Sequence, residues 1–86
     1  MADRPAVSPM DWVVVGHIRC VVAAVRDAGD PFGDCEVVCN PSKPANRDIR
    51  WDGSAWQFVE SGDYGGYAEK YERLRPYVNK LLNRSL

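Results

Sequence analysis

A valine-rich stretch near the N-terminus carries the first strong pattern of apolar positions. At roughly 100° per residue, its apolar side chains fall within a sector of roughly 140°, the width of an amphipathic helix face. These side chains are Val14, Val15, Ile18, Val21, Val22, Val25 and Ala28. Strand alternation fits less well, because Arg19 would then share a face with several valines. The pattern therefore predicts a helix over residues 9–28.

The residues that flank this stretch also favour a helix. Ser8 is a good N-cap, Pro9 suits the first helical position, and Asp11 stands where a capping box places an acid. Gly29 is typical of the position after a helix C-terminus. The high strand propensity of valine leaves an alternative open, in which two strands are broken near Gly16.

The segment 47–60 predicts an antiparallel hairpin. Gly53-Ser54 matches a two-residue type II′ turn, in which glycine comes first. This register gathers aromatic and apolar side chains on one face, with Trp51 opposite Trp56, Ile49 opposite Phe58, and Arg47 meeting Glu60 at the far end. The other face is mostly polar, as expected for a sheet with one side in water.

Two further elements complete the predicted order. Cys35 to Cys39 predicts a short strand, and the proline-containing loop 40–46 follows it. From Tyr67 onward the apolar positions again share a sector of roughly 140°, which indicates a second helix. Pro76 lies on the polar side of that helix, where we expect a kink or a helix restart.

These elements predict one domain over residues 1–86, with residues 1–7 as a loose tail. The predicted fold class is α+β, a two-layer α-β-β-β-α fold in which a three-stranded antiparallel meander carries two helices on one face. The alternative is a small all-β SH3-like barrel with a C-terminal helix. The α-β-β-β-α order is similar, in topology only, to that of double-stranded-RNA-binding domains. That family carries a lysine cluster at the start of its second helix, where residues 67–71 here hold one lysine and an adjacent glutamate.

Composition narrows the class of protein further. The 86 residues include 11 basic and 12 acidic side chains, for a formal charge of −1. This balance argues against a dedicated nucleic-acid binder. No apolar run reaches the roughly 18 residues that cross a bilayer, so we expect no membrane association.

An odd number of cysteines suits a reduced protein, and we expect a cytoplasmic location. The acidic residues between 27 and 36 are interpreted as surface charge.

No motif predicts catalysis, a cofactor or a metal site. His17 and Cys20 could share a helical face, but no further ligand or orienting group is evident. Cys35 and Cys39 would lie roughly 13 Å apart along a strand, too far for one disulfide or one metal ion. The loop Gly62–Gly66 precedes a helix, yet its spacing matches neither common phosphate-binding motif.

The sequence favours a small non-catalytic module that acts by protein–protein association, including homodimerisation. Its 3 Trp, 4 Tyr and 2 Phe are more than one small core covers, and exposed aromatic side chains favour association. The candidate interaction surface is Arg47, Arg50, Gln57, Tyr64, Arg73 and Tyr77. One alternative is a nucleic-acid-binding protein that uses the basic C-terminal helix with Arg47 and Arg50. A second is a ligand binder or small enzyme whose pocket forms between subunits.

Overall fold

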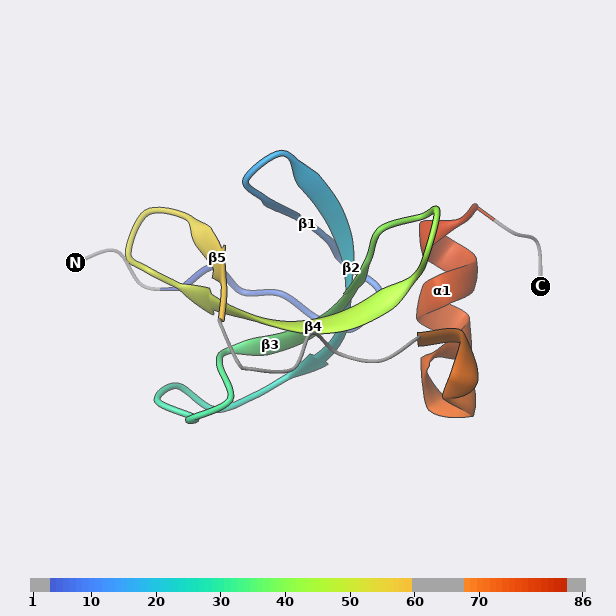
Figure 1. Cartoon of the computed structure of the whole chain (residues 1–86). Coiled ribbons are helices and arrows are strands. Elements are labelled where there is room, and N and C mark those ends of the chain that lie inside the picture. Colours follow the sequence, from blue (N-terminus) through green and yellow to red (C-terminus); the bar gives the residue numbers. More distant parts are fainter. Residues whose placement is uncertain (1–3, 60–67, 84–86) are drawn as a thin grey trace.

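The structure, a computed structural model, describes residues 4–59 and 68–83. In this part of the chain, five strands precede three short helical segments (Figure 1). The strands are β1 (Trp12–Val15), β2 (Ile18–Val25), β3 (Cys35–Cys39), β4 (Ala45–Trp51) and β5 (Trp56–Phe58). The helical segments are the 3₁₀ helices η1 (Ala68–Lys70) and η2 (Glu72–Leu74), and the α-helix α1 (Arg75–Leu81).

The strands close into a barrel. Consecutive strands pair antiparallel, and β1 meets β5 through the parallel pair Val15–Trp56. Helix α1 stands beside the barrel, where it packs on β2 and β3 (Figure 1). The predicted two-layer α+β fold is therefore wrong, and the alternative of a small SH3-like barrel with a C-terminal helix fits.

The helix predicted over residues 9–28 is wrong because this segment forms β1, a tight turn and β2. In the centre of β2, the consecutive residues Cys20–Ala23 are all buried. They point alternately into the barrel and towards α1, and a bulge between Val22 and Ala24 shifts the register. A strand covered on both faces has no apolar–polar alternation, so its apolar run resembles a helix.

The residues expected to cap that helix close a turn instead. The Ser8 N–H donates to Asp11 Oδ2 at 2.8 Å, and the Asp11 N–H donates to the Ser8 carbonyl at 3.0 Å. Between them, Met10 has a φ of 81°. This left-handed conformation cannot continue into a right-handed helix, so the capping-box residues serve a turn that leads into β1.

The predicted strand over Cys35–Cys39 and the predicted hairpin are confirmed. Trp51 lies opposite Trp56 and Ile49 opposite Phe58, as the register required. The two indole rings meet edge to face with their centroids 5.3 Å apart. The expected pairing of Arg47 with Glu60 lies outside the described residues.

The C-terminal helix is shorter than predicted. The two 3₁₀ helices precede α1, which begins at Arg75 with Pro76 in its first turn. The helix restart expected at this proline is therefore confirmed. Proline fits the first turn of a helix because the backbone N–H groups of that turn have no acceptor within the helix, so the missing proline N–H costs no hydrogen bond. Within the described residues, no helix is both long and apolar enough to cross a bilayer.

The core has two parts that share β2 and β3. The barrel interior holds Val13, Val15, Cys20, Val22, Cys35, Val37, Cys39, Ile49 and Trp56. The layer between the barrel and the helical segments holds Val21, Ala23, Val38, Ala68, Leu74, Val78 and Leu81. Each of these two strands thus buries side chains on both of its faces.

The start of the described chain contacts the barrel. Val7 packs against the barrel interior cluster. The Arg4 guanidinium donates to the Arg26 carbonyl at 2.8 Å and to the Asp34 carboxylate at 3.2 Å. Residues 4–7, which the sequence assigned to a loose tail, are held by these contacts.

Candidate functional site

A cavity of about 540 Å³ opens at one end of the barrel, between the β1–β2 turn and the β3–β4 loop. Because β2 and β3 are antiparallel, the start of β2 lies beside the end of β3, which brings these two connections together. The lining residues are His17, Ile18, Arg19, Cys39, Asn40, Pro41, Ala45 and Arg47. Two are arginines, one is histidine, and none of the described lining residues is a carboxylate. The cavity therefore suits an anionic or acidic group.

A tight turn positions the first side of the cavity. Val15 pairs with Ile18, so Gly16 and His17 form a two-residue hairpin loop. Gly16 has a φ of 63°, as glycine in the first position of such a loop can readily adopt. The turn places the exposed His17 at the rim.

Arg19 joins the cavity to an exposed apolar strand face. Its guanidinium carbon lies 4.4 Å from the centroid of the Trp12 ring, while its side chain also lines the cavity. Trp12 and Val14 lie on the outer face of β1, with 38% and 55% of their surfaces exposed. The expectation of exposed aromatic side chains is thus confirmed for Trp12.

Arg47 forms part of the opposite wall. It pairs with the core residue Val37 across β3 and β4 and is half-buried. Its guanidinium carbon lies 4.0 Å from the centroid of the Phe58 ring. A cation stacked on an aromatic ring loses much of its rotamer freedom, so its positive charge has a defined position beside the cavity.

A pair of buried thiols lies between these walls. Cys39 lines the cavity, and both Cys39 and Cys20 belong to the cluster in the barrel interior. The neighbouring Cys20 thiol and the nearby Arg47 guanidinium lower the pKa of Cys39, against the opposing effect of burial. The neighbouring Cys39 thiol and burial raise the pKa of Cys20.

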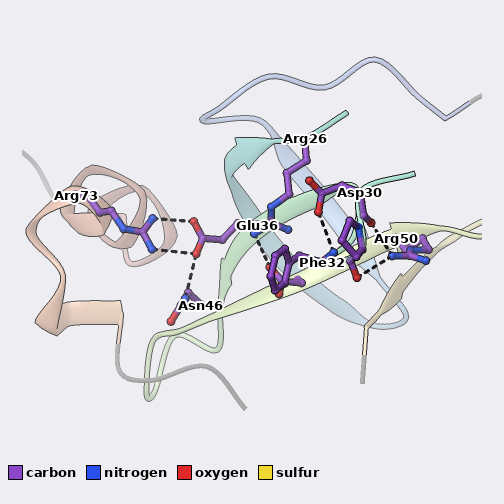
Figure 2. A network of polar contacts seen from close by, with 9 residues as sticks. Arg26, Asp30, Phe32, Glu36, Asn46, Arg50 and Arg73 are labelled. Atoms are coloured by element: carbon purple, nitrogen blue, oxygen red, sulfur yellow. Dashed lines mark hydrogen bonds and ion pairs between the residues drawn. The ribbon is translucent and has the colours of Figure 1, made fainter. Parts of the chain in front are cut away.

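Two residues of the predicted interaction surface are neighbours whose polar groups bond within the chain. Arg50 and Gln57 face each other across β4 and β5. Arg50 donates to the carbonyls of Asp30 at 3.0 Å and Pro31 at 3.4 Å, as Figure 2 shows for Asp30. Gln57 donates to the Asp52 carboxylate at 3.1 Å.

The other predicted surface residues lie on different elements. Arg73 bonds to Glu36, and Tyr77 packs half-buried against the helical layer. Arg47 lies at the cavity, and Tyr64 is outside the described residues. The structure therefore distributes the predicted residues among the cavity, the hairpin and the helical segments.

The network around Glu36 fastens the helical segments to the barrel (Figure 2). The Arg73 guanidinium donates to both Glu36 carboxylate oxygens, at 2.8 and 3.2 Å, and Asn46 donates to one of them at 3.1 Å. These bonds, those from Arg73 first, lower the pKa of Glu36 although burial opposes the shift. We assign this network to structure, because Glu36 is only 7% exposed.

The described residues place no three potential metal ligands of the His, Cys, Asp and Glu types together. His17 is exposed at the turn, whereas Cys20 is buried inside the barrel. The helical face they were expected to share does not exist. Asp34, one of the acids interpreted as surface charge, is 8% exposed and accepts bonds from Arg4 and the Trp51 N–H. The glycine-rich loop Gly62–Gly66 lies outside the described residues.

The predicted interaction surface did not include Trp12, His17 and Arg19, because the sequence pattern placed all three on a helix. The available signal was Gly16-His17, which has the same glycine-first form as the hairpin loop identified at Gly53-Ser54. No protein-family model matches the chain, and comparisons with curated proteins and with solved structures gave no match either.

Proposed function

We propose that this chain is a non-catalytic protein-interaction module that binds an acidic, partly apolar segment of a partner protein. One observation carries the proposal: the exposed apolar face of β1 continues through Arg19 into a cavity lined by basic side chains. We term this the hairpin surface, defined by Trp12, Val14, His17, Arg19 and Arg47.

The chemistry of the hairpin surface determines what it can recognise. Trp12 and Val14 are partly exposed to solvent, so a partner could bury their apolar surface. The two arginine guanidinium groups match the fork geometry of a carboxylate. An extended segment in which apolar and acidic residues alternate would place the two kinds of side chain on these two regions.

The same groups favour binding over catalysis. A Cys–His or other base-assisted nucleophile needs a third group that orients the base. None of the described lining residues is a carboxylate that could orient His17. The cations of the cavity instead provide charge complementarity, which gives binding specificity and a faster encounter.

The test uses three synthetic probes and the amide NMR spectrum of the full chain. The probes are a peptide of alternating leucine and glutamate, a matched peptide of alternating leucine and lysine, and a thymidine oligonucleotide. We expect the leucine–glutamate peptide to shift the amides of the β1–β2 turn and of the β3–β4 loop. The lysine peptide should leave them unchanged.

Substitutions then locate the binding site. Trp12→Ala and Arg19→Ala should each weaken peptide binding about tenfold, since an anchoring aromatic or arginine contributes about 1–2 kcal/mol. Phe32→Ala is the matched control, because Phe32 is 67% exposed but lies in the β2–β3 connection at the other end of the barrel. Equal losses in all three variants would contradict the assignment.

Two other occupants would overturn the proposal in recognisable ways. Oligonucleotide binding that falls steeply with salt would assign the surface to nucleic acid. A dimer that protects Trp12 would assign it to a second copy, and light scattering measures this directly. Pairing of two copies through a sheet edge is not favoured, because the described strands close into a barrel and leave little free edge.

A further inference from the structure

We propose that Cys20 and Cys39 form a reversible cross-strand disulfide when the protein meets a hydroperoxide, with Cys39 oxidised first. The inference concerns a modification site inside the barrel and does not depend on the proposed function. The described chain holds three free cysteines, Cys20, Cys35 and Cys39, and all are buried.

The strand register brings the two thiols together. Val21 pairs with Val38, so one step further along the antiparallel β2 and β3 places Cys20 opposite Cys39. Both side chains belong to the barrel interior cluster, where the Cys20 thiol donates to the Ile18 carbonyl at 3.8 Å. Formation of a bond between them would therefore keep the register of β2 and β3.

The type of pair also favours a cross-link. The Val22 N–H donates to the Asp11 carbonyl, and the Val22 carbonyl accepts from the Met10 N–H, so the backbone groups of Val22 point away from β3. Cys20 is two residues earlier and shares this orientation. Cys20 and Cys39 are thus a non-hydrogen-bonded pair, the arrangement in which opposite side chains come closest.

Access and charge distinguish the roles of the two thiols. Cys39 lines the cavity, whereas Cys20 is fully buried behind it. The Cys20 thiol and the Arg47 guanidinium lower the pKa of Cys39, which increases its thiolate fraction. A small oxidant entering the cavity would therefore meet Cys39 first, and Cys20 would be the resolving thiol.

The chemistry balances with hydrogen peroxide as the oxidant. The Cys39 thiolate attacks one peroxide oxygen, the O–O bond breaks, and the leaving hydroxide takes a proton to give water. Cys20 then attacks the sulfenic sulfur of Cys39, the S–S bond forms, and the second oxygen leaves as water. The two cysteines lose two electrons and two protons together, and a dithiol reductant reverses the change.

The test treats the folded full chain with hydrogen peroxide and measures its mass and its reactive thiols. We expect a loss of about 2 Da and of two of the three thiols, reversed by dithiothreitol. Cleavage after both Arg26 and Glu36 places each of the three cysteines in its own fragment, so fragment masses identify the pair in the unmodified sequence. This identification holds even if a cysteine variant fails to fold.

Cys35→Ala is the matched control. Cys35 lies on the same strand and in the same cluster, but burial raises its pKa, and the residues opposite it are Val25 on β2 and Ile49 on β4. The C35A variant should still lose about 2 Da, whereas C20A should stop at oxygen addition on Cys39. Disulfide formation should also be faster in the folded chain than in concentrated urea.

Three outcomes would overturn the inference. They are retention of all three thiols under peroxide, a disulfide that includes Cys35 or a second chain, and an equal rate of disulfide formation in urea. The first would mean that the pair is shielded from oxidants, and the others that the native pairing of β2 and β3 gives no advantage.

Discussion

Gly33 shows how one backbone atom can determine a residue type. It has a φ of 116°, and a Cβ added there would lie 2.8 Å from the Ile49 carbonyl oxygen and 3.0 Å from Val59 Cγ2. The Ile49 carbonyl also accepts the Asp34 N–H at 2.7 Å, so it has little freedom to move. Both the conformation and the space therefore require glycine.

We predict that Gly33→Ala lowers the free energy of unfolding by more than about 2 kcal/mol, because backbone strain adds to a steric clash. Gly29→Ala is the control, since Gly29 has a φ of 85° but nothing within 4 Å of an added Cβ. Gly29→Ala should lower the free energy of unfolding by about 1 kcal/mol, from the backbone conformation alone. Urea denaturation compares the two, and equal losses would contradict the steric argument.

Asp52 organises the β4–β5 turn through its carboxylate. Oδ1 accepts the N–H groups of Ser54 and Ala55, each at 2.8 Å, and Oδ2 accepts from Gln57. These bonds, with that of Ser54 first, lower the pKa of Asp52 from 3.8 to about 2. The stabilisation is therefore present above pH 3.8 and is lost as the pH falls towards 2.

We predict that Asp52→Ala lowers the melting temperature at neutral pH, and that this difference from the parent shrinks as the pH falls below 3.8. Asp52→Asn should lower the melting temperature less at neutral pH, since the amide oxygen can still accept hydrogen bonds from the N–H groups of the turn. Thermal melts followed by circular dichroism over this pH range measure the effect. If the difference in melting temperature between D52A and the parent did not change with pH, the ionised carboxylate would not be the source of the stabilisation.

At the scale of elements, the hairpin could be predicted and the first two strands could not. Gly53 lies between segments that alternate clearly, because the outer face of that hairpin is polar. Gly16 stands in an equivalent loop, but β2 after it is buried on both faces and carries a bulge. The coverage of the outer face of β2 by α1 depends on tertiary packing, which the local periodicity of the sequence does not reveal.

The salt bridge between Glu36 and Arg73 is an element-scale contact, because it joins β3 to η2. We predict that Arg73→Ala lowers the free energy of unfolding by about 1–2 kcal/mol, a range that allows for the exposure of the arginine. The loss should diminish below pH 4.5, because the pKa of Glu36 is lowered in the folded chain and its protonation removes the ion pair.

Arg75→Ala is the matched control for this contact. Arg75 Nη1 lies 3.9 Å from Glu72 Oε1, and both side chains are largely exposed. Its removal should change stability by less than about 0.5 kcal/mol. Urea titrations of both variants at neutral and acidic pH make the comparison, and similar losses in the two would contradict a specific role for the Glu36 pair.

At the scale of the whole molecule, the candidate site depends on barrel closure. Arg19 and Arg47 are far apart in the sequence, and the antiparallel pairing of β2, β3 and β4 brings them to one cavity. Arg47 could be chosen from sequence because it lies on a recognisable hairpin. Trp12 and Arg19 could not, because their proximity follows from the turn at Gly16.

The two parts of the core predict a single cooperative unfolding transition. Neighbouring residues of one strand, such as Val37 and Val38, belong to opposite layers, so neither layer can open without disturbing the shared strands. Leu74, fully buried in the helical layer, should therefore affect the barrel as well.

We predict that Leu74→Ala lowers the free energy of unfolding by about 2–4 kcal/mol. Tryptophan fluorescence reports on the barrel, because Trp12, Trp51 and Trp56 all lie on its strands. The midpoint of this signal and the loss of amide protection in α1 should shift together, because both layers share β2 and β3. Val14→Ala, at a residue 55% exposed, is the apolar control and should shift neither probe appreciably. If α1 lost protection at lower denaturant while the tryptophan signal kept its midpoint, the helical segments would be an independent layer, and the barrel would be stable without them.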